Sequence, residues 1–301
     1  MEQIAWPPLP YADWEPTKQT LHRYAQIVGK VRMALTPPRN HWWHVTLYPH
    51  TRGLTTGPMP DGDRYADITL DLLDHRIVVS TTDGERRVLE LRERPACADV
   101  YHGLFAALRE LGVDAPIRPE PFDLGDSPPF ADDRRHATYD GEAVERFWRA
   151  LASTARVLEE FRGSFAGKAS PVHLFWHSFD LAHARYSGRR APVAPGTDAV
   201  SAEAYSHEVI AFGFWPGDDR RTPFPAFYSY TAPEPPGLTG RPLGPPAAAW
   251  QDTGSGSLAV LPYDDVRTAP DPHAVLLDFF EHAYLAGAGA AGWDVVDFRR
   301  G

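Results

Sequence analysis

The sequence predicts an α+β protein with two pseudo-repeated halves, each an antiparallel β-meander flanked by two helices. Helical periodicity occurs in four separate segments, and short strand-like runs follow the first and the third of them. A tryptophan-histidine pair, at 42–45 and at 175–178, takes the same place in each half. The expected halves are residues 1–125 and 126–301, with the boundary inside the proline-rich stretch 113–139. A chain without duplication could show the same order, so both interpretations stay open.

The first half begins with a predicted helix that Pro16 can open and Pro37 ends. Its apolar side chains recur at helical spacing, at Leu21, Tyr24, Val28, Val31 and Leu35. Three strand-like runs follow, ADITLDLL, HRIVVSTT and RRVLEL, and the turn sequence TDGE joins the last two. A second helix is expected from about 96 to 111, with Gly112 as its stop signal.

In the second half, Asp140 can cap a long helix with one apolar face. That face contains Val144, Phe147, Leu151, Ala155, Leu158 and Phe161. Five strand-like segments come next: PVHLFWHSF, YSHEVIAFGFW, PAFYSYT, AAAWQD and SLAVLPY. The stretch 233–246 is too rich in proline and glycine for a regular element and is predicted to be a loop. A final helix should begin at Asp271 and Pro272, a cap followed by proline in the first turn.

The motif NHWWHV contains the first candidate site residues, His41 and His44. On a helix these two side chains would share a face and could hold one ion, whereas on a strand they would point to opposite faces. The prolines upstream and the β-formers downstream favour a strand. We therefore expect Trp43 and Val45 to enter the core, while Trp42 and His44 face a cavity.

The segment PVHLFWHSF presents the same choice for His173 and His177. On the predicted strand, four residues would separate them by about 13 Å, too far for one ion with ligand bonds of ~2 Å. A metal site would then need ligands from several strands, and the candidate set is His44, His173, His207 and Glu208. Such a set would suit zinc or non-haem iron. The alternative is that each histidine is a hydrogen-bonded core residue.

Arginines that follow this segment suggest an anionic ligand, because guanidinium groups bind carboxylate or phosphate bidentately. The candidate anchors are Arg185 and Arg189, and Asp180 could orient a histidine or pair with one of them. The alternative is a surface loop whose arginines pair with nearby acidic residues.

Composition excludes several classes of protein. The formal net charge of −10 argues against binding to nucleic acid or to anionic membranes. Cys97 is the only cysteine, so neither an intrachain disulfide nor a cysteine-based zinc site is expected. The N-terminal sequence lacks the pattern of a signal peptide, and no apolar run approaches the ~20 residues of a membrane span. We expect a cytoplasmic protein, and the sequence does not indicate its oligomeric state.

Several long motifs together resemble a known family. They are QIVGKVR, NHWWHV, RGLTT, SPVH-FW-SFDL, SGRRAP, SHEV and GFWPG. They span nearly the whole chain and resemble a bacterial family catalogued only as a domain of unknown function. The resemblance implies no activity, cofactor or residue role. His177 stands where this pattern leads us to expect glycine, which shifts the weight to the four candidate metal ligands.

From these observations we expect a small-molecule enzyme, with a divalent metal such as zinc or iron as a candidate cofactor. The candidate catalytic residues are His44, His207, Glu208 and Asp180. The candidate substrate-binding residues are Trp42, Tyr48, Trp176, Arg185 and Arg189. Two alternatives stay open: a non-catalytic protein that binds a planar or apolar ligand in an aromatic pocket, and a structural or partner-binding protein.

Overall fold

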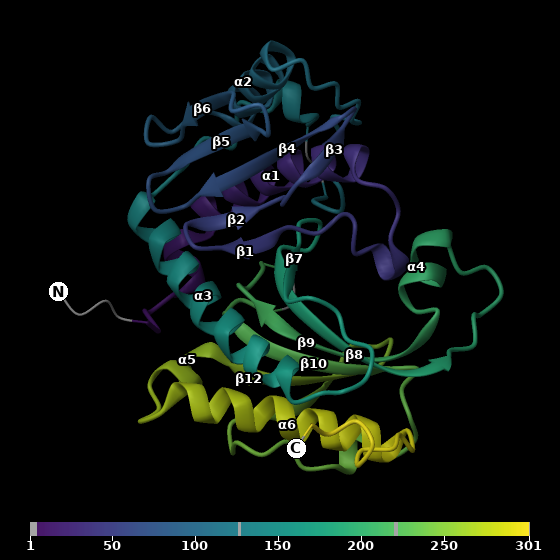
Figure 1. Ribbon diagram of the computed structural model, residues 1–301. Helices are drawn as coiled ribbons and strands as arrows, with labels where there is room; N and C mark the ends of the chain where they lie inside the picture. The colour runs from purple at the N-terminus through teal and green to yellow at the C-terminus, as the bar shows by residue number, and fades with distance from the viewer. Residues whose placement is uncertain (1–4, 126–127, 220–221, 301) are drawn as a thin grey trace.

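The computed structural model describes residues 5–125, 128–219 and 222–300 and shows an α+β fold with two antiparallel sheets (Figure 1). The fold class expected from the sequence is confirmed. Each half starts with a long helix, continues into a six-stranded sheet and ends with a helix. This shared order is what a duplication predicts, and the duplication itself stays a prediction.

The N-terminal sheet has the strand order β1-β2-β4-β5-β6, and β3 pairs with β4. The elements of this half are α1 (Tyr11–Leu35), η1 (Asn40–Trp42), β1 (Tyr48–His50), β2 (Gly53–Thr55), β3 (Met59–Asp61), β4 (Arg64–Asp71), β5 (Arg76–Thr81), β6 (Arg86–Glu90) and α2 (Cys97–Glu110). The three predicted strands correspond to β4, β5 and β6. The strands β1 to β3 were not predicted, because three-residue strands carry too short a pattern of alternation to be recognised.

The C-terminal sheet has the order β11-β12-β10-β9-β8-β7. The elements of this half are η2 (Phe130–Asp132), α3 (Gly141–Gly163), β7 (His173–Phe175), β8 (Asp180–Arg190), α4 (Ala199–Ala204), β9 (His207–Trp215), β10 (Ala226–Ala232), η3 (Leu238–Gly240), β11 (Ala249–Asp252), β12 (Ser257–Pro262), α5 (Tyr263–Arg267) and α6 (Pro272–Ala290). The predicted caps are confirmed: Asp140 accepts from the backbone of α3, and Asp271 from that of α6.

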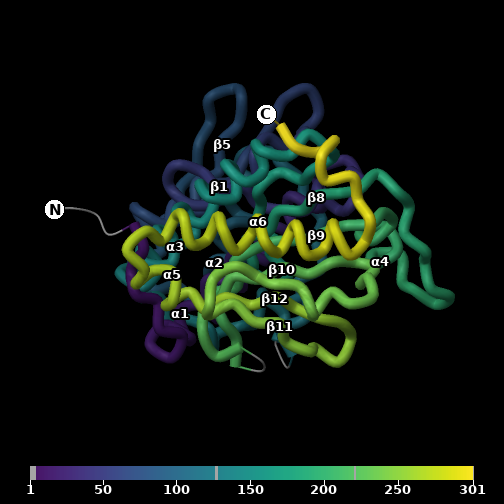
Figure 2. The backbone as a smooth tube through the Cα atoms, turned by 90° about the horizontal axis from the view of Figure 1, so that it is seen from below, coloured from purple at the N-terminus to yellow at the C-terminus, as the bar shows by residue number. Residues whose placement is uncertain are grey.

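The two faces of this sheet carry side chains of different size, because successive residues of a strand point to opposite faces. On β9, Ile210, Phe212 and Phe214 are buried in the hydrophobic core, on the side that α3 and α6 cover. Figure 2, seen from below, shows α6 in front of this sheet. The alternate residues at the centre of β9 are Ala211 and Gly213, so the middle of the opposite face has little side-chain volume there.

The two halves meet where β1 approaches β7. Leu47 and Leu174 exchange backbone hydrogen bonds of 2.9 and 2.7 Å, and one hydrophobic cluster includes residues of both halves. The predicted division at residue 125 therefore separates two sheets that share a core. Within the described part of the chain, no helix combines the length and the apolar character needed to cross a membrane.

Candidate functional site

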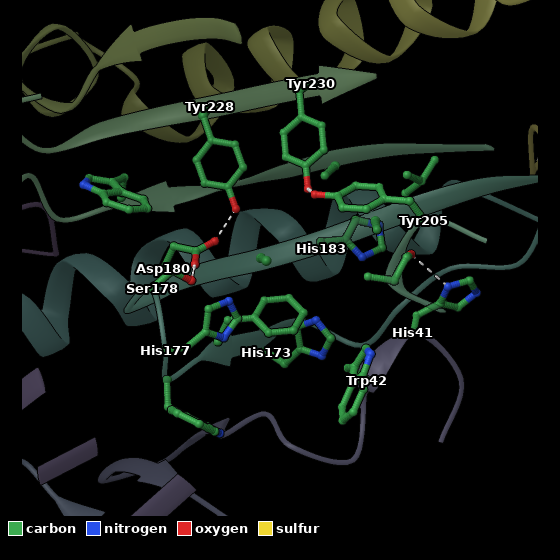
Figure 3. Close-up of a pocket in the computed structure, with 18 of the residues that line it drawn as sticks. His41, Trp42, His173, His177, Ser178, Asp180, His183, Tyr205, Tyr228 and Tyr230 are labelled. Atoms are coloured by element: carbon green, nitrogen blue, oxygen red, sulfur yellow. Dashed lines mark hydrogen bonds between the residues drawn. The ribbon is translucent and has the colours of Figure 1, made fainter. Parts of the chain in front are cut away.

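A large cavity lies between the small-residue face of the C-terminal sheet and the segment that contains η1 (Figure 3). Its volume is about 1040 Å³, at the upper end of the roughly 300–1000 Å³ typical of small-molecule sites. Ala182, Ala184 and Ala211 line its floor, and β10 contributes the rings of Tyr228 and Tyr230. Small residues on the central strands, with large rings on a neighbouring strand, therefore create the space.

Asp180, at the start of β8, is the most buried carboxylate of the cavity wall, with a residue exposure of 6%. Its carboxylate accepts hydrogen bonds from the hydroxyl groups of Tyr228 and Ser178, and Figure 3 shows Tyr228 pointing at it. Burial, reinforced by this carboxylate, raises the pKa of Tyr228 well above its usual value. The Tyr228 hydroxyl therefore stays protonated and acts as a hydrogen-bond donor.

Gly213 makes this arrangement possible. A Cβ atom at this position would lie 2.5 Å from Cζ and Oη of Tyr228 and closer still to the backbone oxygen of Leu181. Because glycine lacks that atom, the Tyr228 ring can lie across β9 and reach Asp180 on the next strand but one.

His173 lines the cavity on β7, directly opposite Ala182. It is 2% exposed, and its Nδ1 is buried with no hydrogen-bond partner in the described part of the chain. Burial lowers the pKa of His173 to about 3, with a smaller effect from Arg32. His173 is therefore neutral at physiological pH, and its Nδ1 is a buried polar atom without a partner in the cavity wall.

His177 also lines the cavity, in the turn that follows β7. We expected His173 and His177 on one strand, PVHLFWHSF. The strand ends at Phe175, so the two histidines do not share it. Burial lowers the pKa of His177, while the carboxylates of Asp180 and Asp123 raise it.

The motif NHWWHV is not the predicted strand. Residues 40–42 form a short 3-10 helix in which His41 and Trp42 have φ angles of 54° and 60°, in the left-handed region. Contacts with α4 hold this conformation: Trp42 Nε1 donates to the Val200 carbonyl over 3.1 Å, and His41 Nδ1 to the Ala204 carbonyl over 3.1 Å. These partners are remote in sequence, which is why local propensity did not predict the shape.

The conformation changes which side chains reach the cavity. Trp43, expected in the core, lines the cavity together with Trp42, and Val45 is in the core as expected but also lines the cavity. His44, expected to face the cavity, does not line it. Its ring packs against Trp42 at 5.2 Å between centroids, and its Nδ1 accepts from the Arg39 backbone amide over 3.2 Å.

The four candidate metal ligands do not form a ligand set. Glu208 accepts from Arg189 over 2.7 Å and from Trp293 over 2.9 Å. His207 lies next to Ser206, with 3.1 Å between Nδ1 and Oγ, and of the four candidates His173 alone lines the cavity. Among residues 5–125, 128–219 and 222–300, no three His, Cys, Asp or Glu side chains are grouped to hold a metal ion. The strands and the turn that carry the candidates direct them to different partners.

The candidate substrate-binding residues also separate into two groups. Trp42 and Trp176 line the cavity, and Trp176 Nε1 donates to the Val45 carbonyl over 2.7 Å. The other three candidates, Tyr48, Arg185 and Arg189, do not line it.

Each of these three candidates has its own partners. Arg185 lies on the helix side of β8, with its guanidinium carbon 3.4 Å from the centroid of the Phe161 ring, and burial lowers its pKa to about 10. Arg189 pairs with the acidic residue Glu208, as the alternative expected, but it lies on strand β8 and not in a surface loop. The Tyr48 hydroxyl donates to the Trp43 carbonyl over 3.3 Å.

Sequence reasoning missed Tyr205, Tyr228 and Tyr230 as cavity residues. Tyr228 and Tyr230 are two apart on β10, and the hydroxyl of Tyr230 lies 3.1 Å from that of Tyr205 (Figure 3). The signal was present in PAFYSYT, where alternation places both rings on one face, and in AFGFW, where it places the small residues on one face.

The fold and the cavity together define an α+β protein with an aromatic-lined site of ligand size. The model of a family described as a family of unknown function (DUF5996) matches residues 6–300, and the chain belongs to that family. The resemblance seen in the motifs is thereby confirmed. No curated protein and no solved structure matches the chain.

Proposed function

We propose that the protein binds a small organic molecule in the cavity of the C-terminal sheet. The observation that carries this proposal is the Nδ1 atom of His173, which is buried in the wall of an aromatic cavity and has no partner within the described residues. A buried polar atom without a hydrogen bond costs roughly 1–3 kcal/mol. A polar group on a bound molecule would remove that cost.

The protonation states of the histidine and tyrosine side chains in the cavity wall support binding more directly than catalysis. Burial keeps His173 neutral, and it keeps Tyr228 protonated. The Ser178 hydroxyl donates a hydrogen bond to Asp180 and not to a histidine, so it lacks the histidine base that activates a serine nucleophile. Such groups act as fixed hydrogen-bond donors and acceptors around an apolar ligand.

A cavity-filling substitution tests the proposal. Ala211→Phe adds a ring to the cavity floor, and Val88→Phe adds the same ring to an exposed position of β6 as a matched control. Small aromatic probes should change the fluorescence of the cavity tryptophans in the wild type and in Val88→Phe. The Ala211→Phe variant should bind them at least tenfold more weakly. Equal binding by both variants, or no binding by the wild type, would contradict the proposal.

Acid-base chemistry on the bound molecule is a second candidate function. The observation that favours it is His177, which lines the cavity: burial lowers the pKa of this imidazole, and the carboxylate of Asp180 opposes that shift. The test is to follow bound probes by NMR over time with the wild type and with His177→Gln. Product formation that depends on His177 supports an enzyme, and unchanged probes restrict the function to binding.

A further inference from the structure

The charges of the cavity wall indicate what kind of molecule it can accept. The described lining residues carry carboxylates at Asp180, Asp218 and Asp252 and one ammonium group at Lys30. Burial lowers the pKa of every lining histidine, and these are His41, His173, His177 and His183. The histidines therefore add little positive charge at neutral pH.

Asp180 differs from the other two carboxylates because it is deeply buried. Its exposure is 6%, and its partners are the hydroxyl groups of Ser178 and Tyr228. A carboxylate can accept about four hydrogen bonds, so two hydroxyl donors leave part of its capacity unused. Among the described residues, no arginine or lysine forms an ion pair with Asp180, and burial lowers the pKa of the nearby His177 and so disfavours its charged form. A buried negative charge without a counter-charge is costly, and a cationic ligand would compensate it.

Aromatic residues lie beside Asp180. Phe175 is its cross-strand neighbour in the β7–β8 pair, the Tyr228 hydroxyl bonds to its carboxylate, and Trp215 lines the same cavity. The faces of such rings attract cations, with the largest effect in sites from which water is excluded. A carboxylate combined with aromatic faces is suited to an ammonium group.

An anionic ligand finds less support. Arg185 and Arg189, the residues that suggested one, do not line the cavity. The ammonium group of Lys30 lies 6.0 Å from the centroids of the Trp176 and Phe130 rings, so it already has aromatic contacts. Lys30 is still the group at which an anion would bind, so an anionic probe and the Lys30→Met variant test this outcome.

We propose that the ligand of this cavity is a small organic amine, with its ammonium group on the carboxylate of Asp180 and its apolar body over the alanine floor. This inference rests on the proposed binding function. It goes further by assigning Asp180 as the residue that selects the charge of the ligand, with Tyr228 and Ser178 holding the carboxylate in place.

Three probes of similar size separate the possible charges: 2-phenylethylamine, 2-phenylethanol and 3-phenylpropanoate. Their dissociation constants should be measured by calorimetry with the wild type, with Asp180→Asn and with Asp252→Asn. Asp252 is an exposed residue at the edge of the cavity, so its substitution removes the same charge without touching the proposed contact.

In the wild type, the amine should bind at least tenfold more tightly than the alcohol. Asp180→Asn should weaken amine binding roughly 10- to 100-fold, the range expected for a hydrogen bond to a charged group, and leave alcohol binding within about twofold. Asp252→Asn should change amine binding by no more than about threefold. If Asp180→Asn does not fold, the preference of the wild type for the amine over the alcohol decides the question.

Each contrary outcome has a distinct meaning. Equal affinity for amine and alcohol, or an equal loss of both in Asp180→Asn, overturns the inference and leaves the binding function intact. Tightest binding of the anion, lost in Lys30→Met, replaces the amine by a carboxylate ligand. If none of the three probes binds the wild type, or if the Ala211→Phe variant binds them unchanged, the proposed function fails together with the inference.

Discussion

Substitution of Gly29 by alanine tests how α1 supports the cavity wall. Gly29 lies in the middle of α1, where alanine would normally stabilise a helix by about 1 kcal/mol. Here the added Cβ would lie 2.6 Å from Nε1 of Trp176, and closer still to Cγ and Cδ1 of that ring. The indole is 4% exposed and its Nε1 donates to the Val45 carbonyl, so the ring cannot move without losing that bond.

The expected change in the free energy of unfolding follows from three contributions. Overpacking costs about 1–3 kcal/mol, and separating the buried Trp176–Val45 hydrogen bond costs about 1–3 kcal/mol. The higher helix propensity of alanine offsets about 1 kcal/mol of this destabilisation. Gly29→Ala should therefore destabilise the protein by about 1–5 kcal/mol, opposite in sign to the effect of alanine at an open helical position.

Urea denaturation measures this change, and Gly289→Ala is the matched control. Gly289 is an exposed position of α6 where an added Cβ meets no atom within 4 Å, so its substitution should be neutral or stabilising. The double variant Gly29→Ala/Trp176→Leu should lose less stability than the sum of the single variants, because the smaller side chain relieves the overlap. A Gly29→Ala variant as stable as the wild type, or an additive double variant, would refute this reasoning.

Three further predictions concern the pH dependence of stability, the two arginines outside the cavity and the cysteine. Between pH 6.5 and about 3 the unfolded His173 binds a proton that the folded one does not, so the free energy of unfolding should fall as the pH is lowered. His173→Gln should reduce that slope by at most about 1.4 kcal/mol per pH unit, with the largest effect near pH 5, because at pH 6.5 only half of the unfolded histidines carry the proton; urea denaturation between pH 5 and 6.5 measures it. Neither Arg185→Met nor Arg189→Met should change probe affinity in calorimetry by more than about twofold, since neither side chain lines the cavity. Burial raises the pKa of Cys97 to about 12, so a thiol reagent at pH 8 should label it only after unfolding, as followed by mass spectrometry.

The parts of the fold that depend on near neighbours in the chain were predictable. Asp140 and Asp271 cap their helices because a cap needs only the backbone amides two or three residues ahead. The alternation in β4, β5 and β9 is equally local, and it indicated the strands and the α+β class. The family resemblance likewise rested on contiguous motifs, and it agrees with the match over residues 6–300.

Tertiary structure decided the composition of the site. His41 and Trp42 adopt the left-handed backbone region because Val200 and Ala204, about 160 positions later, supply hydrogen-bond partners. That change of direction brings Trp43 to the cavity and removes His44 from it. The sequence by itself determined the long helices and the strands with clear alternation, because helix caps and periodicity depend on residues close in the chain. Pairing between strands that are remote in sequence decides which polar side chains share a cavity. The free energy of such pairing cannot be derived from a local sequence pattern.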